Sequence, residues 1–346
     1  MAYTTINKSS DYFDTRTYSA SGAGSISDVS FQPDFLWFKN RTIVGDHGLM
    51  DAVRGVNGII HSNDTNAEVT SNGTTNITAF TSNGFTYGAS SLIDTGSGTP
   101  CTWLWKANGT GSTNTNGSQN STVSANTAAG FSIVKYTGTG ANVTIGHGLG
   151  VAPKMIHIKG LGNANNWLTG GTNISSNWAS SLHLNTTAGI DTYNYWQNYA
   201  PNTNVFYMTS DGAINQSGID YIAYCFSDVQ GYSKFGSYIG NGSTDGPFVY
   251  TGFKPAFVMV KITAGQTDNW IMQDNKINSF NGPSSQRLRP NSSGAEFSSS
   301  NEIDLLSNGF KTHGNDGEIN GSGFSYIYMA FGQSLVGTNN IPANAR

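Results

Sequence analysis

The chain has 346 residues, of which 11% are charged and 12% aromatic, with 43 glycines and a net charge of −4. Charged residues are less than half of the roughly 25% found in an average globular protein, and so many aromatic residues argue against a disordered chain. Nucleic-acid binding requires a basic surface. Because the chain is acidic and has no cluster of Lys or Arg, we expect no nucleic-acid partner.

The sequence also argues against a membrane location, classical secretion and disulfide crosslinks. No apolar run approaches the roughly 18–20 residues of a membrane span, and the first residues lack the apolar segment of a secretory signal. The two cysteines, Cys101 and Cys225, fit neither a disulfide framework nor a metal knuckle, and we expect two buried thiols. The sequence therefore predicts a chain made in a cytoplasm, with no membrane span.

One pattern occurs three times. Each copy has a Pro six residues before a Lys, with four largely apolar residues directly before that Lys, in the segments Phe31–Lys39, Val151–Lys159 and Phe253–Lys261. From the Pro to a downstream Phe there are 52, 53 and 55 residues, and from that Phe to a closing aromatic residue 20, 20 and 21. Because both intervals hold in all copies, we interpret the chain as three tandem repeats.

In chain order, a short N-terminal arm and the first repeat occupy residues 1–107. Residues 108–129 hold Gly, Ser, Thr and Asn but no charged or aromatic side chain, which is typical of a flexible or extended linker. The second repeat follows at 130–230, and the third, with a C-terminal tail, at 231–346. The short junction at 227–234 predicts that these two lie close together and that the first is placed more independently.

The apolar runs within each repeat are short, rich in β-branched and aromatic residues, and bounded by Gly, Asn or Pro, which is typical of β-strands. At ~100 residues each, the repeats are most simply two-layer antiparallel sandwiches. We predict an all-β protein of three tandem β-sandwiches, with a jelly-roll strand order as one option. The run before each Lys does not alternate in polarity, which indicates a strand covered on both faces or one at a domain interface.

Five segments carry a resemblance to known proteins: Met1–Lys8, Gln32–Arg41, Asp46–Gly55, Gly146–Pro153 and Gly246–Pro255. They resemble virion proteins from tailed phages of marine bacteria, of the cyanophage type, which carry this repeat one to several times and are described as tail-fibre or structural proteins. The resemblance covers essentially the whole chain. It implies a non-enzymatic virion protein that is made in the host cytoplasm and displayed on the particle exterior.

Within that class, we expect a tail fibre or head fibre that attaches the phage to a host surface, with a glycan as target. The alternatives are a capsid decoration or cement protein and a depolymerase of envelope polysaccharide. Expected partners are other virion proteins, of the capsid or tail, and further copies of the chain, as a trimer by analogy with many phage fibres. Three similar modules could instead form a pseudo-threefold cap from one chain.

The candidate ligand-binding residues are four tryptophans. Trp167 and Trp270 stand eight and nine residues after the strand Lys of their repeats, while Trp178 and Trp196 lie in a polar stretch found only in the second repeat. An exposed indole beside Asn and Asp could stack on the apolar face of a sugar while the amides bind its hydroxyls. The alternative interpretation is that the repeated Trp packs on its own sandwich.

Other polar positions favour structural roles. One stretch of the first repeat holds Asp46, His47, Asp51 and Arg54, which we interpret as an ion pair and a turn rather than a metal or ligand site, because the other repeats lack matching residues. The lysines that end the three equivalent strands are expected to be solvated: Lys39, Lys159 and Lys261. No catalytic motif stands out, and we predict no catalytic residue, cofactor or metal.

Overall fold

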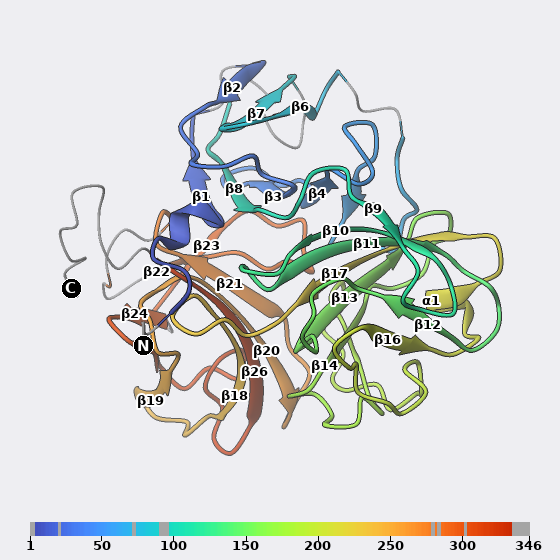
Figure 1. The fold of residues 1–346 in the computed structure, drawn as a ribbon. Coiled ribbons are helices and arrows are strands. Elements are labelled where there is room, and N and C mark those ends of the chain that lie inside the picture. Colours follow the sequence, from blue (N-terminus) through green and yellow to red (C-terminus); the bar gives the residue numbers. More distant parts are fainter. Residues whose placement is uncertain are drawn as a thin grey trace.

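The computed structural model describes residues 4–19, 22–70, 74–89, 97–277, 281, 285–300 and 303–333. Its regular structure is almost entirely antiparallel β-sheet, which confirms the predicted all-β class. In the described residues, the exceptions are a 3₁₀ turn, η1 (Ser9–Asp11), and one short helix, α1 (Gly212–Asn215). The strands form three successive units, which Figure 1 shows arranged around a common centre.

The first unit contains strands β1 to β8. Its large sheet has the order β1-β8-β3-β4-β5, and a second sheet of order β2-β7-β6 covers one face. The bounds are β1 (Phe13–Thr17), β2 (Gly24–Ile26), β3 (Phe35–Asn40), β4 (Gly48–Asp51), β5 (Ile60–His61), β6 (Ile77–Thr81), β7 (Gly84–Tyr87) and β8 (Pro100–Trp105).

The second unit contains strands β9 to β17. Its large sheet has the order β15-β14-β13-β17-β11-β10-β9, and β12 pairs with β16 in the covering layer. The bounds are β9 (Ser112–Asn114), β10 (Ser121–Asn126), β11 (Phe131–Thr137), β12 (Val143–Gly146), β13 (Met155–Gly160), β14 (Leu168–Gly171), β15 (Leu182–His183), β16 (Val205–Met208) and β17 (Asp220–Phe226).

The third unit contains strands β18 to β26. Its large sheet has the order β18-β26-β20-β21, the covering sheet has the order β19-β25-β24, and β22 pairs with β23. The bounds are β18 (Ser233–Ile239), β19 (Asp245–Tyr250), β20 (Pro255–Ala264), β21 (Trp270–Asp274), β22 (Ser285–Arg287), β23 (Phe297–Ser299), β24 (Ile303–Leu306), β25 (Gly309–His313) and β26 (Ser325–Gly332).

The three large sheets share one strand order. In each, the first long strand (β1, β11 or β18) pairs with the last, the last pairs with the strand after the repeated Pro, and that strand pairs with the next. The register agrees as well, because the fourth residue after each Pro lies opposite the middle of the closing strand, in the pairs Trp37–Trp103, His157–Tyr224 and Met259–Met329. The intervals seen in the sequence therefore coincide with equivalent positions in the sheets.

Each unit has a core between its two layers. Side chains from one face of the large sheet meet the covering layer there, for example Leu36 and Phe85 in the first unit, Ile156 and Phe206 in the second, and Val258 and Phe310 in the third. These side chains are almost completely buried.

A fourth core, which we call the shared core, lies where the three units meet. Alternate residues of the same large-sheet strands point into it, so these strands are buried on both faces. Aromatic rings cross every boundary, with centroid distances of 4.1 Å for Phe35–Tyr224, 5.0 Å for Phe13–Phe331 and 6.0 Å for Phe226–Phe331. Burial on both faces explains why the repeated apolar run does not alternate in polarity.

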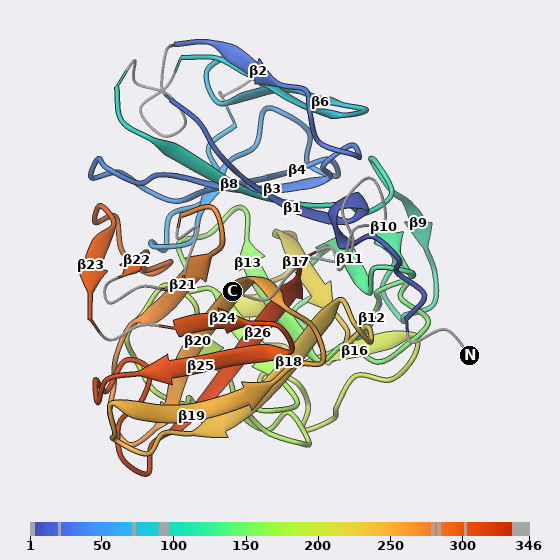
Figure 2. The ribbon, with the colours of Figure 1, turned by 90° about the vertical axis from the view of Figure 1, so that its left-hand side faces the viewer.

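The expectation that the first unit is placed independently is wrong. Figure 2 shows this unit lying across the other two, and its strands β1, β3 and β8 all contribute to the shared core. The length of a connection limits where the next unit can be placed, but the apolar area that the unit buries decides where it rests.

The expectation of a flexible or extended linker at 108–129 is also wrong, because the segment is part of a sheet. This segment forms β9 and β10, and β10 pairs with β11 from Ser121 opposite Tyr136 to Asn126 opposite Phe131. Val123 is buried in the core of the second unit. A strand near the edge of a sheet needs only one apolar face, so its Ser, Thr and Asn content resembled that of a linker.

Candidate functional site

The four candidate tryptophans are all buried, so the prediction that they stack on a sugar at the surface is wrong. Trp178 and Trp196 contact each other edge to face inside the second unit, with centroids 4.9 Å apart. Trp167 and Trp270 lie in the shared core. The polar residues beside these tryptophans in the sequence do not indicate whether the indoles are exposed, because burial depends on which faces of the sheets pack together.

Trp167 and Trp270 have the same structural role. The Trp167 indole N–H donates to the backbone oxygen of His61 at 2.7 Å, which joins the second unit to the first. The Trp270 indole N–H donates to the backbone oxygen of His183 at 3.0 Å, which joins the third unit to the second. The repeated Trp therefore connects neighbouring units rather than packing only on its own sandwich.

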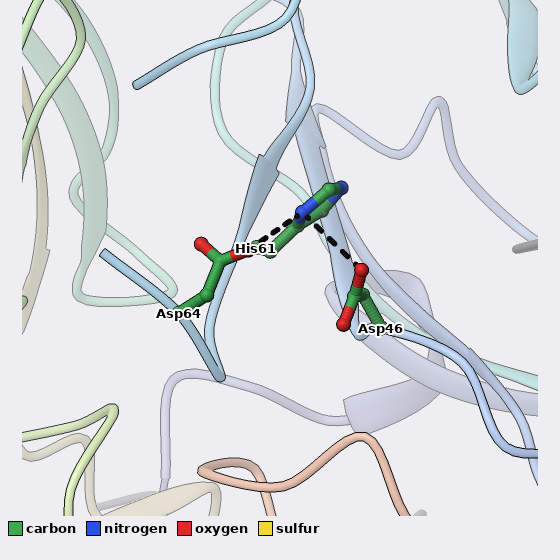
Figure 3. Close-up of side chains that lie close together, drawn as sticks. All are labelled: Asp46, His61 and Asp64. Atoms are coloured by element: carbon green, nitrogen blue, oxygen red, sulfur yellow. Dashed lines mark hydrogen bonds and ion pairs between the residues drawn. The ribbon is translucent and has the colours of Figure 1, made fainter. Parts of the chain in front are cut away.

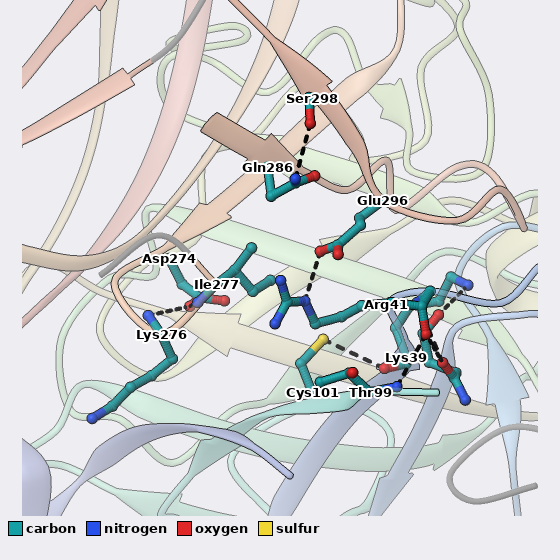
Figure 4. Close-up of polar contacts among 12 residues, drawn as sticks. Lys39, Arg41, Thr99, Cys101, Asp274, Lys276, Ile277, Gln286, Glu296 and Ser298 are labelled. Carbon is teal, nitrogen blue, oxygen red and sulfur yellow. Dashed lines mark hydrogen bonds and ion pairs between the residues drawn. The ribbon is translucent and has the colours of Figure 1, made fainter. Parts of the chain in front are cut away.

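The contact between the first and third units uses different residues. His47 stands where the other units have the Trp, and its Nδ1 accepts a hydrogen bond from Trp37 at 3.0 Å. Burial lowers the pKa of His47 well below its usual range, and Lys39 lowers it further, so the ring is neutral. Arg41 pairs with Glu296 at 2.7 Å across this boundary (Figure 4).

The three repeated lysines are buried, so the expectation of solvated strand ends is wrong. Lys159 Nζ donates to the backbone oxygen of Thr65 in the first unit at 3.1 Å, and Lys261 Nζ donates to that of Thr187 in the second unit at 2.9 Å. Lys39 Nζ bonds within its own unit, to the backbone oxygen of Ile43 at 2.9 Å. Burial lowers the pKa of each of the three ammonium groups to about 8.

The expected ion pair of Asp51 and Arg54 is confirmed. Arg54 Nε lies 2.6 Å from Asp51 Oδ2, Arg54 Nη1 lies 2.8 Å from Glu68 Oε1, and both Asp51 and Arg54 are buried. The Tyr224 hydroxyl of the second unit donates to Asp51 Oδ2 at 2.8 Å. The network therefore fixes the turn after β4 and also joins two units. Asp46 and His47 take no part in it.

Asp46, His61 and Asp64 lie close enough together to be considered as a metal site (Figure 3). His61 Nδ1 faces both carboxylates, at 3.7 Å from Asp46 Oδ2 and 3.2 Å from Asp64 Oδ2. Asn63 donates to Asp46 at 2.7 Å and Asn66 donates to Asp64 at 2.8 Å. Burial raises the pKa of Asp64, but hydrogen bonds from His61 and Asn66 outweigh it and lower the pKa overall. These contacts describe a hydrogen-bonded cluster that fixes the loop after β5.

An open cavity of about 390 Å³ lies between the first and third units. Its lining is polar and includes Lys8, Asn275 and Gln333. Arg16 and Asp14 pair within it at 2.8 Å, and burial raises the pKa of Asp14. The cavity is a polar recess whose main charged pair is already formed.

Four tyrosines of the second unit, which the sequence analysis missed, form what we call the tyrosine surface: Tyr193, Tyr195, Tyr199 and Tyr207. Tyr193 is 54% exposed and Tyr199 is 60% exposed. The rings form two pairs, Tyr193–Tyr195 with centroids 4.8 Å apart and Tyr199–Tyr207 with centroids 5.3 Å apart. The available signal was the density of tyrosines in the stretch found only in the second repeat.

The two tyrosine pairs flank the end of β16. Tyr207 lies in this strand, and just beyond it the backbone N–H of Thr209 donates to the backbone oxygen of Tyr195 at 2.9 Å. The Gln197 amide donates to the backbone oxygens of Met208 at 2.7 Å and Val143 at 3.1 Å. The segment that carries the tyrosines is thereby fastened to both strands of the covering layer.

Fold and surface together define an all-β protein in which three sandwich units close around a shared core, and the second unit presents the tyrosine surface outward. The chain belongs to the family described as domain of unknown function DUF7483, whose model matches residues 8–334. Searches of curated proteins and of solved structures each found no match. Among the described residues, none of the helices has the length and apolar character needed to cross a membrane.

Proposed function

We propose that the protein is a surface component of a tailed-phage particle that attaches the particle to its host by binding a glycan. The sequence resemblance supplies the biological setting. The observation that carries the binding role is the tyrosine surface, which stands on a body held together by a shared core and by hydrogen bonds between units. A rigid body that holds an exposed aromatic surface is suited to binding, because little conformational entropy is lost on contact.

A second candidate function, capsid decoration, is favoured by the arrangement of the units. The second unit bonds to the first, the third to the second, and the first to the third. This cyclic arrangement gives the chain an approximate threefold symmetry, which suits a threefold position of a capsid shell. In this role the protein would bind the capsid shell and would need no host ligand.

The proposed partners are other virion proteins and further copies of the chain, as a trimer by analogy with phage fibres. The alternative is a cap made from one chain, since the threefold arrangement is already complete within it. Sedimentation of the purified protein separates these states. A sedimenting species of 36.7 kDa, the mass of one chain, would rule out an obligate trimer.

Labelling of intact particles with an antibody against the protein, followed by electron microscopy, tests the proposed function. We expect label on the particle exterior, confined to fibres of the tail or head for an attachment protein. Label spread evenly over the shell would favour decoration, and absence from purified particles would contradict both roles. The proposed role is non-enzymatic, so host polysaccharide incubated with the protein should keep its chain length. Shortened polysaccharide chains would instead support a depolymerase.

A further inference from the structure

We infer that the tyrosine surface is the binding site for a neutral glycan. The inference rests on the proposed function and names the ligand class and the residues that contact it.

The ring pairs provide the apolar contact. A pyranose has a face of C–H groups, which packs against an aromatic ring, while its hydroxyls point to the sides. Tyr193 and Tyr199 expose more than half of their surface, and each is backed by a second ring, Tyr195 or Tyr207. Tyrosine offers a large amphipathic contact with few rotatable bonds, so little side-chain entropy is lost on binding.

Polar groups at the edges of the rings supply hydrogen bonds. Asp191 Oδ2 accepts from the Tyr195 hydroxyl and from His183 Nε2, each at 3.0 Å. The Asn202 amide donates to the Tyr207 hydroxyl at 3.1 Å. A carboxylate has about four acceptor positions, and an amide has two donors and an acceptor. Asp191 Oδ1 also accepts from the backbone N–H of Tyr193, and Asn202 Oδ1 accepts from two backbone N–H groups. One acceptor position on Asp191 and one amide hydrogen of Asn202 therefore remain for a sugar hydroxyl.

The charge of the surface selects against acidic sugars. Residues 186–211, which include all four tyrosines, contain two aspartates, Asp191 and Asp211, and no Lys or Arg. The nearby negative charge of Asp211, and then hydrogen bonding to it, raise the pKa of Tyr193, so its hydroxyl is neutral at ordinary pH. A uronic or sialic acid would meet carboxylates without a compensating cation, whereas a neutral glycan meets only hydrogen-bonding groups.

The loop is fixed before any ligand binds. Gln197 and Asn198 both have a φ of 57°, in the left-handed region that non-glycine residues seldom adopt. Trp196, directly before them, is buried, and its indole N–H donates to Ser181 Oγ at 2.8 Å. The buried Trp and the left-handed pair together turn the chain so that Tyr195 and Tyr199 can stand at the surface on either side of the anchor.

The test is binding of the full-length protein to immobilised bacterial surface polysaccharides, in matched sets of neutral and uronic-acid-containing chains. We expect the wild type to bind at least one neutral polysaccharide and no acidic one. The double variant Tyr193→Ser/Tyr199→Ser should bind at least ten-fold more weakly. Tyr250→Ser is the matched control, because Tyr250 is 61% exposed but lies on the third unit, and its binding should stay within two-fold of wild type.

A thermal midpoint for each variant shows that it is folded, and Tyr199→Phe, which keeps the ring, should retain most of the binding. Absence of binding to every neutral polysaccharide, binding to acidic chains alone, or full binding by the double variant would each overturn the inference. Labelling of particles is independent of these results. A protein found on the particle exterior that binds no neutral glycan would leave the proposed virion role standing and remove only this ligand.

Discussion

The inner faces of the three large sheets are alike in all three units, whereas the exterior of the units is not. The inner faces use equivalent positions in every unit, with Trp105, Phe226 and Phe331 at the ends of the closing strands, and they meet in the shared core. The exterior of the units, beyond the covering layers, differs between them, and the tyrosine surface occurs only on the second. The comparison teaches that the repeated positions maintain the assembly of units, while the proposed binding site lies in residues that only one unit has.

The largest expected effect comes from the inner face. Trp105 contacts rings of all three units, including Phe35, Phe226 and Phe331. Trp105→Ala should lower the free energy of unfolding by about 3–5 kcal/mol, because a buried Trp leaves a large cavity. Urea denaturation measures the change. Tyr199→Ser, on the outer side, should change it by less than about 0.5 kcal/mol. Equal losses in the two variants would remove the distinction between the faces.

The buried ion pair of Asp51 and Arg54 in the first unit, which accepts a hydrogen bond from Tyr224 of the second, is expected to have the next largest effect. Arg54→Met leaves Asp51 buried without its cation, which costs about 3 kcal/mol. The double variant Asp51→Asn/Arg54→Met removes both charges and should recover part of that loss, and the difference is measured by a double-mutant cycle in urea. If the double variant were as unstable as the sum of the single changes, the two charges would not be coupled.

The buried lysines predict a dependence of stability on pH. Their native pKa of about 8 lies below the usual 10.5, so between these values the unfolded chain holds more protons and stability rises with pH. From pH 8 to pH 9 each lysine should add about 1 kcal/mol to the free energy of unfolding. The two buried thiols, whose pKa is raised by burial, begin to oppose this rise near pH 9.

Urea denaturation at pH 8 and pH 9 measures this rise in the wild type and in Lys159→Met. The variant should lose about a third of the lysine contribution, because one of three equivalent groups is removed. A wild-type stability that stays flat or falls between these two pH values would contradict the assignment of the three lysines as buried ammonium groups.

The smallest effect concerns the hydrogen bonds between units. Trp270→Phe keeps a ring in the shared core but removes the bond to the backbone oxygen of His183, which should cost about 1 kcal/mol in urea denaturation. Trp178→Phe is the control, since the Trp178 indole N–H has no hydrogen-bond partner in the described structure. A larger loss for Trp178→Phe would show that ring packing, and not the bond between units, dominates.

Strand content and equivalent positions could be predicted from the sequence, because short β-branched runs and repeated intervals depend on local pattern. The prediction of a strand covered on both faces also followed from the run at Phe35–Phe38, although the pattern did not show what covers the second face. The shared core depends on which sheet faces meet, and that information is absent from local pattern.

The prediction of exposed tryptophans was wrong for the same reason. Trp196 and Tyr199 are three residues apart in one polar stretch, yet the first is buried and the second is exposed. Left-handed backbone at Gln197 and Asn198 separates their directions. Asn adopts this conformation more often than most residues, but Gln gives no signal for it as a glycine would. Residue size was also a poor guide. Trp196, the largest side chain in this stretch, was predicted to bind a ligand, but it is buried and anchors the loop.

Differential scanning calorimetry of the full chain tests the central claim that three units fold around one shared core. We predict a single transition whose calorimetric enthalpy equals its van't Hoff enthalpy, because no unit can expose its inner face without exposing those of its neighbours. Two or three separate transitions, with the first unit melting apart from the others, would contradict the account.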